Sequence, residues 1–205
     1  MNKAQRFEAA PVYLTLMVSL IAGLGLLHSL ATQPAEAAAS TGTVIDPPRQ
    51  LTDFTLTDQT GKTMRLSDLR GRVALVFFGY TNCPDDCPTA MARFTVIKKA
   101  LGESANNFAF VFISVDGRRD TPEALTHFLA KFDPSFIGLT GDEALVLHIG
   151  ADFFAFFDHD PATGQVEHGT RSYLVDAQGR LRIAYPADVP PKNIAAEMLK
   201  LESSG

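Results

Sequence analysis

The sequence predicts an α/β domain, in which a mixed β-sheet carries helices on both faces, preceded by a single hydrophobic membrane segment. Two apolar runs, 73–80 and 108–116, are continuous, as in strands that are buried on both faces of a sheet. Each run is followed by a segment with the signals of a helix, an alternation typical of parallel strands joined by helices. At 205 residues, the chain is long enough for one such domain plus an N-terminal appendage.

The first half of the domain is expected to contain a hairpin and two helices besides the buried strands. Residues 54–57 and 63–66 alternate in polarity around a glycine-containing turn, which predicts an N-terminal hairpin. Residues 89–101 have apolar side chains at helical spacing, so they would share one face. Thr121 is suited to cap a second helix, and Pro122 to occupy its first position.

The second half repeats the alternation and then ends in a hairpin and a helix. A short strand is expected at 136–141 and a helix at 142–153. Residues 171–186 read as two strands around the turn at Gln178–Gly179. Residues 190–202 form an amphipathic pattern, which predicts a C-terminal helix.

The N-terminal region contains a segment of the right length to cross a membrane. No charged residue occurs from Ala9 to Ala35, and the mostly apolar stretch 12–31 would span about 30 Å as a helix. Lys3 and Arg6 precede it, which favours a cytoplasmic N-terminus and export of the rest. We expect an uncleaved anchor with the domain on the periplasmic side. The alternative is a signal peptide that is cleaved near residues 36–38, leaving the domain soluble in the periplasm.

The expected partition is therefore an anchor or signal segment at 1–31, a flexible linker at 32–48 and one folded domain at 49–203. The linker is rich in Ala, Thr, Ser and Pro and has no periodicity. Removing residues 1–31 removes two of 18 basic and one of 23 acidic residues, which leaves a net charge of −6. This acidic balance, with no basic stripe, predicts that nucleic acid is not a partner.

The chain has only two cysteines, Cys83 and Cys87, in the crossing from the first buried strand to the following helix. This is the carboxyl end of a central strand, where α/β sheets place their sites. On a helix, residues i and i+4 have Cβ atoms about 5–6 Å apart, whereas a disulfide needs about 3.5–4.5 Å. The pair therefore suits a shared soft metal ion, Cu(I) or Zn(II), and can close as a disulfide only if the loop distorts. A redox switch remains open, and a structural disulfide over so short a loop is disfavoured.

A metal site of this kind needs a third ligand, and the candidates are the five histidines. His28 lies in the membrane segment, while His127 and His148 lie in expected helices where solvent exposure is the simpler interpretation. His159 sits in a polar turn. His168 lies in the turn before an apolar strand, so it can project at the sheet end that carries the cysteines, and we rank it ahead of His159.

Three blocks of sequence, in this order and spacing, resemble the Sco/SenC family over residues 49–203. They are "FFGYTNCPDDCPTAM", "ISVDGRRDTPEAL" and "EHGTRSYLVDAQGR". The resemblance implies a thioredoxin-like fold that binds one copper ion, Cu(I) or Cu(II), through Cys83, Cys87 and His168. It also implies an acidic residue, Asp116, near that site.

The resemblance implies a copper metallochaperone that delivers copper to the binuclear copper centre of cytochrome c oxidase. Its expected partner is the copper-bearing oxidase subunit, with other copper chaperones or thioredoxin-like reductases as further candidates. The alternative is a thiol–disulfide oxidoreductase that reduces the cysteines of an oxidase subunit, with Cys83 and Cys87 as its redox pair. An assembly factor rather than an enzyme is the preferred interpretation.

Overall fold

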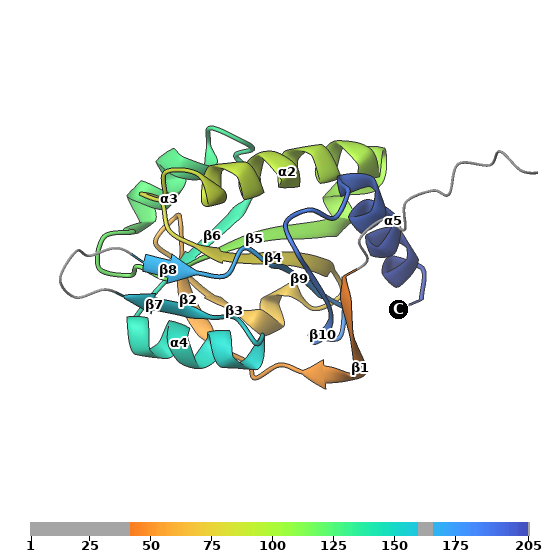
Figure 1. The fold of residues 1–205 in the computed structure, drawn as a ribbon, viewed down its shortest axis with the longest axis horizontal. Coiled ribbons are helices and arrows are strands. Elements are labelled where there is room, and N and C mark those ends of the chain that lie inside the picture. Colours follow the sequence, from red (N-terminus) through yellow and green to blue (C-terminus); the bar gives the residue numbers. More distant parts are fainter. Residues whose placement is uncertain (1–41, 160–165, 205) are drawn as a thin grey trace, which may run out of the picture. The chain divides into compact units, whose positions relative to one another are not determined.

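The computed structural model describes residues 42–159 and 166–204, which Figure 1 draws in colour. The hydrophobic segment and most of the expected linker lie outside the described residues. Within the described ranges, no helix is long and apolar enough to cross a membrane.

The centre of the fold is an eight-stranded mixed sheet with the strand order β1-β10-β9-β4-β5-β6-β2-β3. Its middle strands β4, β5 and β6 run parallel, and the other neighbours pair antiparallel. The expected hairpins are both present, as β2–β3 and β9–β10. The bounds of these strands are β2 Thr55–Asp58, β3 Thr63–Arg65, β4 Val73–Gly79, β5 Phe108–Ser114, β6 Ile137–Thr140, β9 Ser172–Val175 and β10 Arg180–Tyr185.

Helices cover both faces of this sheet, as the sequence predicts. Within the described ranges the α-helices are α2 (Asp86–Leu101), α3 (Pro122–Leu129), α4 (Glu143–Asp152) and α5 (Pro191–Glu202), and 3₁₀ helices span Leu66–Leu69 and Gly102–Asn107. Figure 1 shows α2 and α5 above the sheet and α4 below it. The expected cap of α3 is confirmed: the Thr121 side chain accepts a hydrogen bond from the amide of Ala124, and proline follows at the first helical position.

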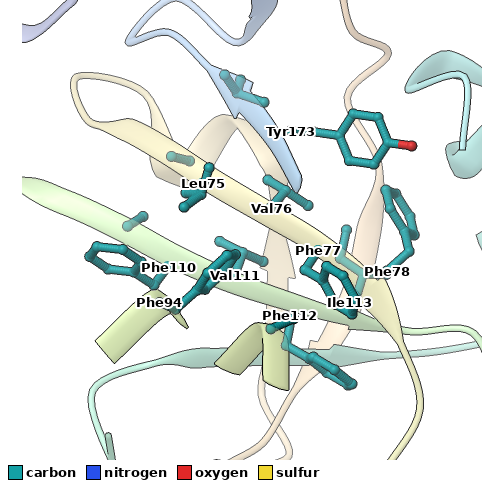
Figure 2. Packing of buried hydrophobic residues seen from close by; sticks show 14 of the residues in the cluster. Leu75, Val76, Phe77, Phe78, Phe94, Phe110, Val111, Phe112, Ile113 and Tyr173 are labelled. Atoms are coloured by element: carbon teal, nitrogen blue, oxygen red, sulfur yellow. The ribbon is translucent and has the colours of Figure 1, made fainter. Parts of the chain in front are cut away.

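The core explains why the two middle strands are almost entirely apolar. All seven residues of β4 and all seven of β5 are buried, because helices pack on both sides of them. On one face, Phe110 contacts Phe94 of α2. On the other, Phe78 contacts Tyr173 and also Phe153, which follows α4. Figure 2 shows these strands side by side with their aromatic side chains.

The expected linker is wrong for its last residues, because Thr43–Gln50 form the strand β1. This strand pairs with β10 alone and lies at the edge of the sheet, with an irregular register between Val44 and Arg49. Pro47 and Pro48 fall in that irregular part. Proline is tolerated on an edge strand, where its missing N–H is not needed by a second neighbour.

The structure contains a second sheet, of two strands, that the sequence did not predict. Its strands β7 (Phe157–His159) and β8 (Val166–His168) pair antiparallel, with Phe157 opposite His168. His159 is thus the end of a strand rather than part of a polar turn. We call β7 and β8 the histidine ribbon, because β8 ends at the predicted ligand.

Candidate metal centre

The two cysteines lie where the central strand β4 gives way to helix α2. We call residues 80–87 the cysteine loop. Cys87 lies in the first turn of α2, whereas Cys83 precedes the helix, so the two do not share a helical face. Both side chains are buried, and they are free thiols in this structure.

The cysteine loop is tied to the fold by a buried carboxylate. Asp120 accepts hydrogen bonds from the amide of Thr81 at 2.9 Å, the hydroxyl of Thr81 at 2.6 Å and the hydroxyl of Ser114 at 2.7 Å. Because Asp120 is fully buried, these three bonds replace its hydration. The loop is thereby fastened to the end of β5.

The third predicted ligand reaches the cysteines from the histidine ribbon. The Nε2 atom of His168 lies 3.4 Å from the sulfur of Cys87 and 3.8 Å from the sulfur of Cys83. The three ligand atoms lie within 4.8 Å of one another. The structure therefore brings together three residues that are separated by up to 85 positions in the chain.

The imidazole of His168 is held so that Nε2 can act as a ligand. Its other nitrogen, Nδ1, lies 3.1 Å from the carbonyl oxygen of Gly169. A carbonyl only accepts, so Nδ1 carries the proton and Nε2 keeps its lone pair for the site. The rings of Phe77 and Tyr80 meet the imidazole edge-on, with centroids at 5.9 and 5.6 Å, which fixes its plane.

Two further histidines, on α3 and α4, do not belong to this cluster. His127 is exposed on α3 near Glu123, and His148 is exposed on α4. Both confirm the expectation of solvent-facing helical positions. His28 lies outside the described residues, and no side-chain contact of His159 is described.

The environment of the Cys87 thiol keeps it protonated while no metal is bound. Burial is the main cause that raises the pKa of Cys87, and the neighbouring Cys83 and Asp86 raise it further. The hydrogen bond from the Tyr80 amide, 3.4 Å from the sulfur, opposes this increase without overcoming it. Burial also raises the pKa of Tyr80, as do the two nearby sulfurs. A cation that binds here must therefore displace the Cys87 proton.

The donor set fits a small soft cation. In a three-coordinate site with bonds of about 2.0–2.3 Å, the ligand atoms lie about 3.7–4.0 Å apart. The separations of 3.4 and 3.8 Å are close to this, so small side-chain shifts suffice. Two sulfurs and one imidazole nitrogen favour Cu(I) or Zn(II) over the hard cations Mg²⁺ and Ca²⁺.

Asp116, predicted to lie near the site, is buried and has Arg119 as the partner of its carboxylate. The charge of Arg119 also acts on the Tyr80 side chain, which in turn forms a hydrogen bond with Cys83. Asp116 thus connects to the ligands through two intermediates, and its role stays a prediction.

Asp120 and Tyr80 are the residues that sequence reasoning missed. Tyr80 could have been noticed as the aromatic residue that ends the buried strand beside Cys83.

Comparisons with known proteins agree with this geometry. The SCO1/SenC family model matches residues 43–202. An SCO2-like protein of Rickettsia felis is 33% identical over 203 residues, covering 95% of this chain and 98% of its own length. Among solved structures, Bradyrhizobium japonicum ScoI with copper bound matches with a TM-score of 0.68 and 34% identity, covering 74% of this chain and 99% of ScoI.

A further solved structure concerns the redox chemistry of such proteins. It is BsSco, described as a member of the Sco family of cytochrome c oxidase assembly proteins in which a disulfide switch was identified. It matches with a TM-score of 0.68 and 26% identity, and covers 80% of this chain and 99% of BsSco. With the family model extending from β1 to the end of α5, this chain belongs to the SCO1/SenC family.

Proposed function

We propose that this chain binds one copper ion through Cys83, Cys87 and His168 and delivers it to the copper-bearing subunit of cytochrome c oxidase. The convergence of two sulfurs and one imidazole nitrogen within 4.8 Å is the observation that carries the proposal. Copper bound to ScoI, a relative with the same fold, supports the choice of copper over zinc. An oxygen ligand added from solvent would adapt the site to Cu(II).

Delivery requires that the ion can be reached from outside. Cys83 and His168 line an open hollow at the protein surface, whereas Cys87 is fully buried and does not line it. An incoming thiolate would therefore meet copper on the Cys83 and His168 side and displace the buried ligand last. Copper would pass by exchange of ligands, with no change in its oxidation state.

The proposal includes a location. Residues 1–31 would hold the domain at the periplasmic face of the membrane, where an oxidase subunit can be reached by diffusion in two dimensions. Cleavage near residues 36–38 would instead release a soluble periplasmic domain. Other copper chaperones would load the site, and thioredoxin-like reductases would keep the two thiols reduced in an oxidising compartment.

The second candidate function is thiol–disulfide exchange, favoured by the disulfide switch of BsSco and by the free thiols of this structure. Cys83 and Cys87 would be oxidised to a disulfide, and a partner's disulfide would take up their two electrons and two protons. This reaction does not need His168, which separates the two functions.

The test is His168→Ala in the full-length chain, purified in detergent under reducing conditions. We expect copper affinity to fall by about 100-fold. This is the upper end of the loss seen when a residue that only hydrogen-bonds to a metal ligand is removed. Copper titration followed by absorption spectroscopy measures stoichiometry, affinity and ligand type. His127→Ala, which removes an exposed histidine, is the matched control and should bind copper like the wild type.

Reduction of a disulfide substrate should persist in His168→Ala, because both thiols remain. Unchanged copper affinity in this variant would overturn the ligand assignment. A wild-type chain that binds no copper, yet reduces the disulfide of an oxidase subunit, would favour thiol–disulfide exchange instead.

A further inference from the structure

The hollow beside Cys83 and His168 has a wall of distinctive chemistry. Three carboxylate side chains line it, from Asp85, Asp86 and Glu167, and all three are exposed. No lysine or arginine lines this hollow within the described ranges. Among the ion pairs of the described residues, none involves these three carboxylates. The approach to the site is thus negatively charged.

An exposed aromatic residue completes the same wall. Phe156 is 65% exposed, whereas the next residue, Phe157, is buried in the core. The backbone alternation of strand β7 begins here, so one ring faces inward and its neighbour faces the solvent. The exposed ring of Phe156 lines the hollow together with the two accessible ligands.

Phe156 is fixed close to the ligand histidine by the backbone. Its carbonyl accepts a hydrogen bond from the amide of Gly169 at 2.8 Å, and Phe157 pairs with His168 across the ribbon. Its position relative to the site is therefore set before any partner arrives. An exposed aromatic residue whose backbone is held at the edge of a polar site has the character of an interface hot spot.

An acceptor that takes copper from this site must contact the wall of the hollow. The sulfur of an acceptor must come within about 2.3 Å of the ion, the length of a metal–thiolate bond given for zinc. It can do so only through the hollow, because Cys87 is fully buried on the inner side. Any protein that takes the ion must therefore contact the residues that surround Cys83 and His168.

We propose that Phe156, Asp85, Asp86 and Glu167 form the docking surface for the copper acceptor, which presents lysine or arginine side chains and an apolar recess around its own cysteines. This inference rests on the proposed function and specifies its partner. The carboxylates attract a basic surface and repel an acidic one, which sets orientation and association rate. Phe156 supplies the apolar contact that holds the complex while ligands exchange.

The experiment measures copper transfer from the full-length chain to the copper-bearing oxidase subunit of the same organism. The variants are Phe156→Ala and Glu167→Lys, and a small Cu(I) chelator serves as a second acceptor that needs no docking surface. Leu147→Ala and Glu123→Lys are matched controls, because these residues are exposed on α4 and α3 and do not line the hollow.

We expect each docking variant to transfer copper to the subunit about 10-fold more slowly, while both controls keep the wild-type rate. Transfer to the chelator should stay unchanged in all variants, since the ligands are intact. Added salt should slow the wild type and should affect Glu167→Lys much less, because screening acts on the attraction that this variant has lost.

Wild-type rates to the subunit in both docking variants would overturn the docking surface and leave the proposed function standing. Equal slowing towards the subunit and the chelator would also overturn it, since the residues would then act on copper binding itself. A wild-type chain that holds copper but never passes it to the subunit would overturn the proposed function, and the docking surface with it.

Discussion

The cysteine loop and the histidine ribbon meet at one site but are anchored at different depths in the fold. The cysteine loop follows β4, the strand at the centre of the eight-stranded sheet, and enters the sixteen-residue helix α2. Asp120 fastens its start through three buried hydrogen bonds. Movement of the loop would therefore break contacts in the core.

The histidine ribbon has much less to hold it. It consists of two strands of three residues each that form a sheet of their own. An isolated two-stranded ribbon is only marginally stable, so its order depends on the packing of Phe157 and Val166, both buried. Phe157 stacks on Phe78 with ring centroids 6.1 Å apart.

This difference suits a site that must both hold and release an ion. In the proposed function, two firmly placed sulfurs would define the position of copper, and an imidazole on a less stable element would leave first when an acceptor arrives. Local opening draws on the least stable elements of a structure. We therefore expect hydrogen exchange to be faster in β8 than in β4 or β5.

The largest expected effect comes from removing the anchor of the cysteine loop. Asp120→Ala leaves two hydroxyl groups and one amide without their acceptor in a buried place. We expect the free energy of unfolding to fall by about 2–4 kcal/mol. Denaturant titration measures this loss. The control is Glu123→Ala, because the Glu123 side chain is 87% exposed. A loss below about 1 kcal/mol would mean that the loop does not depend on Asp120.

The sequence alone predicts the cysteine side of the site well and its supports poorly. The continuous apolar run of β4, followed by helical spacing, places both cysteines in the crossing from that strand to the next helix, and α2 begins at Asp86. Asp120 gives no such signal, because an aspartate before Thr-Pro reads as an ordinary turn residue. Its burial depends on Thr81 and Ser114, which reach it from other elements of the fold.

The histidine side shows a different limit. His168 is identified because it precedes a recognisable apolar strand, yet the ribbon that carries it is too short for any periodicity to predict. Strand β1 is missed for another reason, since its two prolines and exposed side chains resemble a linker. It becomes a strand only because β10 offers it a partner. In each case tertiary contacts decide the local structure.

A second prediction adds the same methyl group to each side of the site. In Gly79→Ala, the new Cβ would lie 2.6 Å from the sulfur of Cys87 and 2.8 Å from the ring of Phe77. We expect unfolding free energy to fall by about 1–3 kcal/mol and copper affinity to fall with it, because the thiol is pushed from its place. In Gly169→Ala, the nearest atom is the carbonyl oxygen of Phe156 at 3.7 Å, an ordinary contact.

Gly169→Ala should therefore change stability by no more than about 0.5 kcal/mol. Thermal or urea unfolding of the two variants, with copper titration of each, makes the comparison. Equal losses on the two sides would contradict the view that only the cysteine side is tightly packed around its ligand.

The smallest expected effect is a pH dependence on the histidine side. Asp152, at the end of α4, accepts hydrogen bonds from the Arg49 side chain at 2.9 Å and from the Thr52 amide at 3.1 Å. Burial tends to raise the pKa of Asp152, but these hydrogen bonds outweigh it and hold the pKa below its ordinary value of 3.8. The ionised form is thus favoured by folding.

A lowered pKa in the folded state means that this stabilisation is complete above pH 3.8 and is lost as pH falls through the folded-state pKa. Asp152→Asn should therefore lower the free energy of unfolding by less than about 1 kcal/mol near pH 7, since the pair is partly exposed. The difference from the wild type should vanish near pH 2, whereas exposed Glu103→Gln should show little difference at either pH.

Because Asp152 ties α4 to the segment before β2, and α4 leads into the histidine ribbon, its loss should speed hydrogen exchange in β8 before it affects the cysteine loop. Equal acceleration in both places would show that the two sides open together.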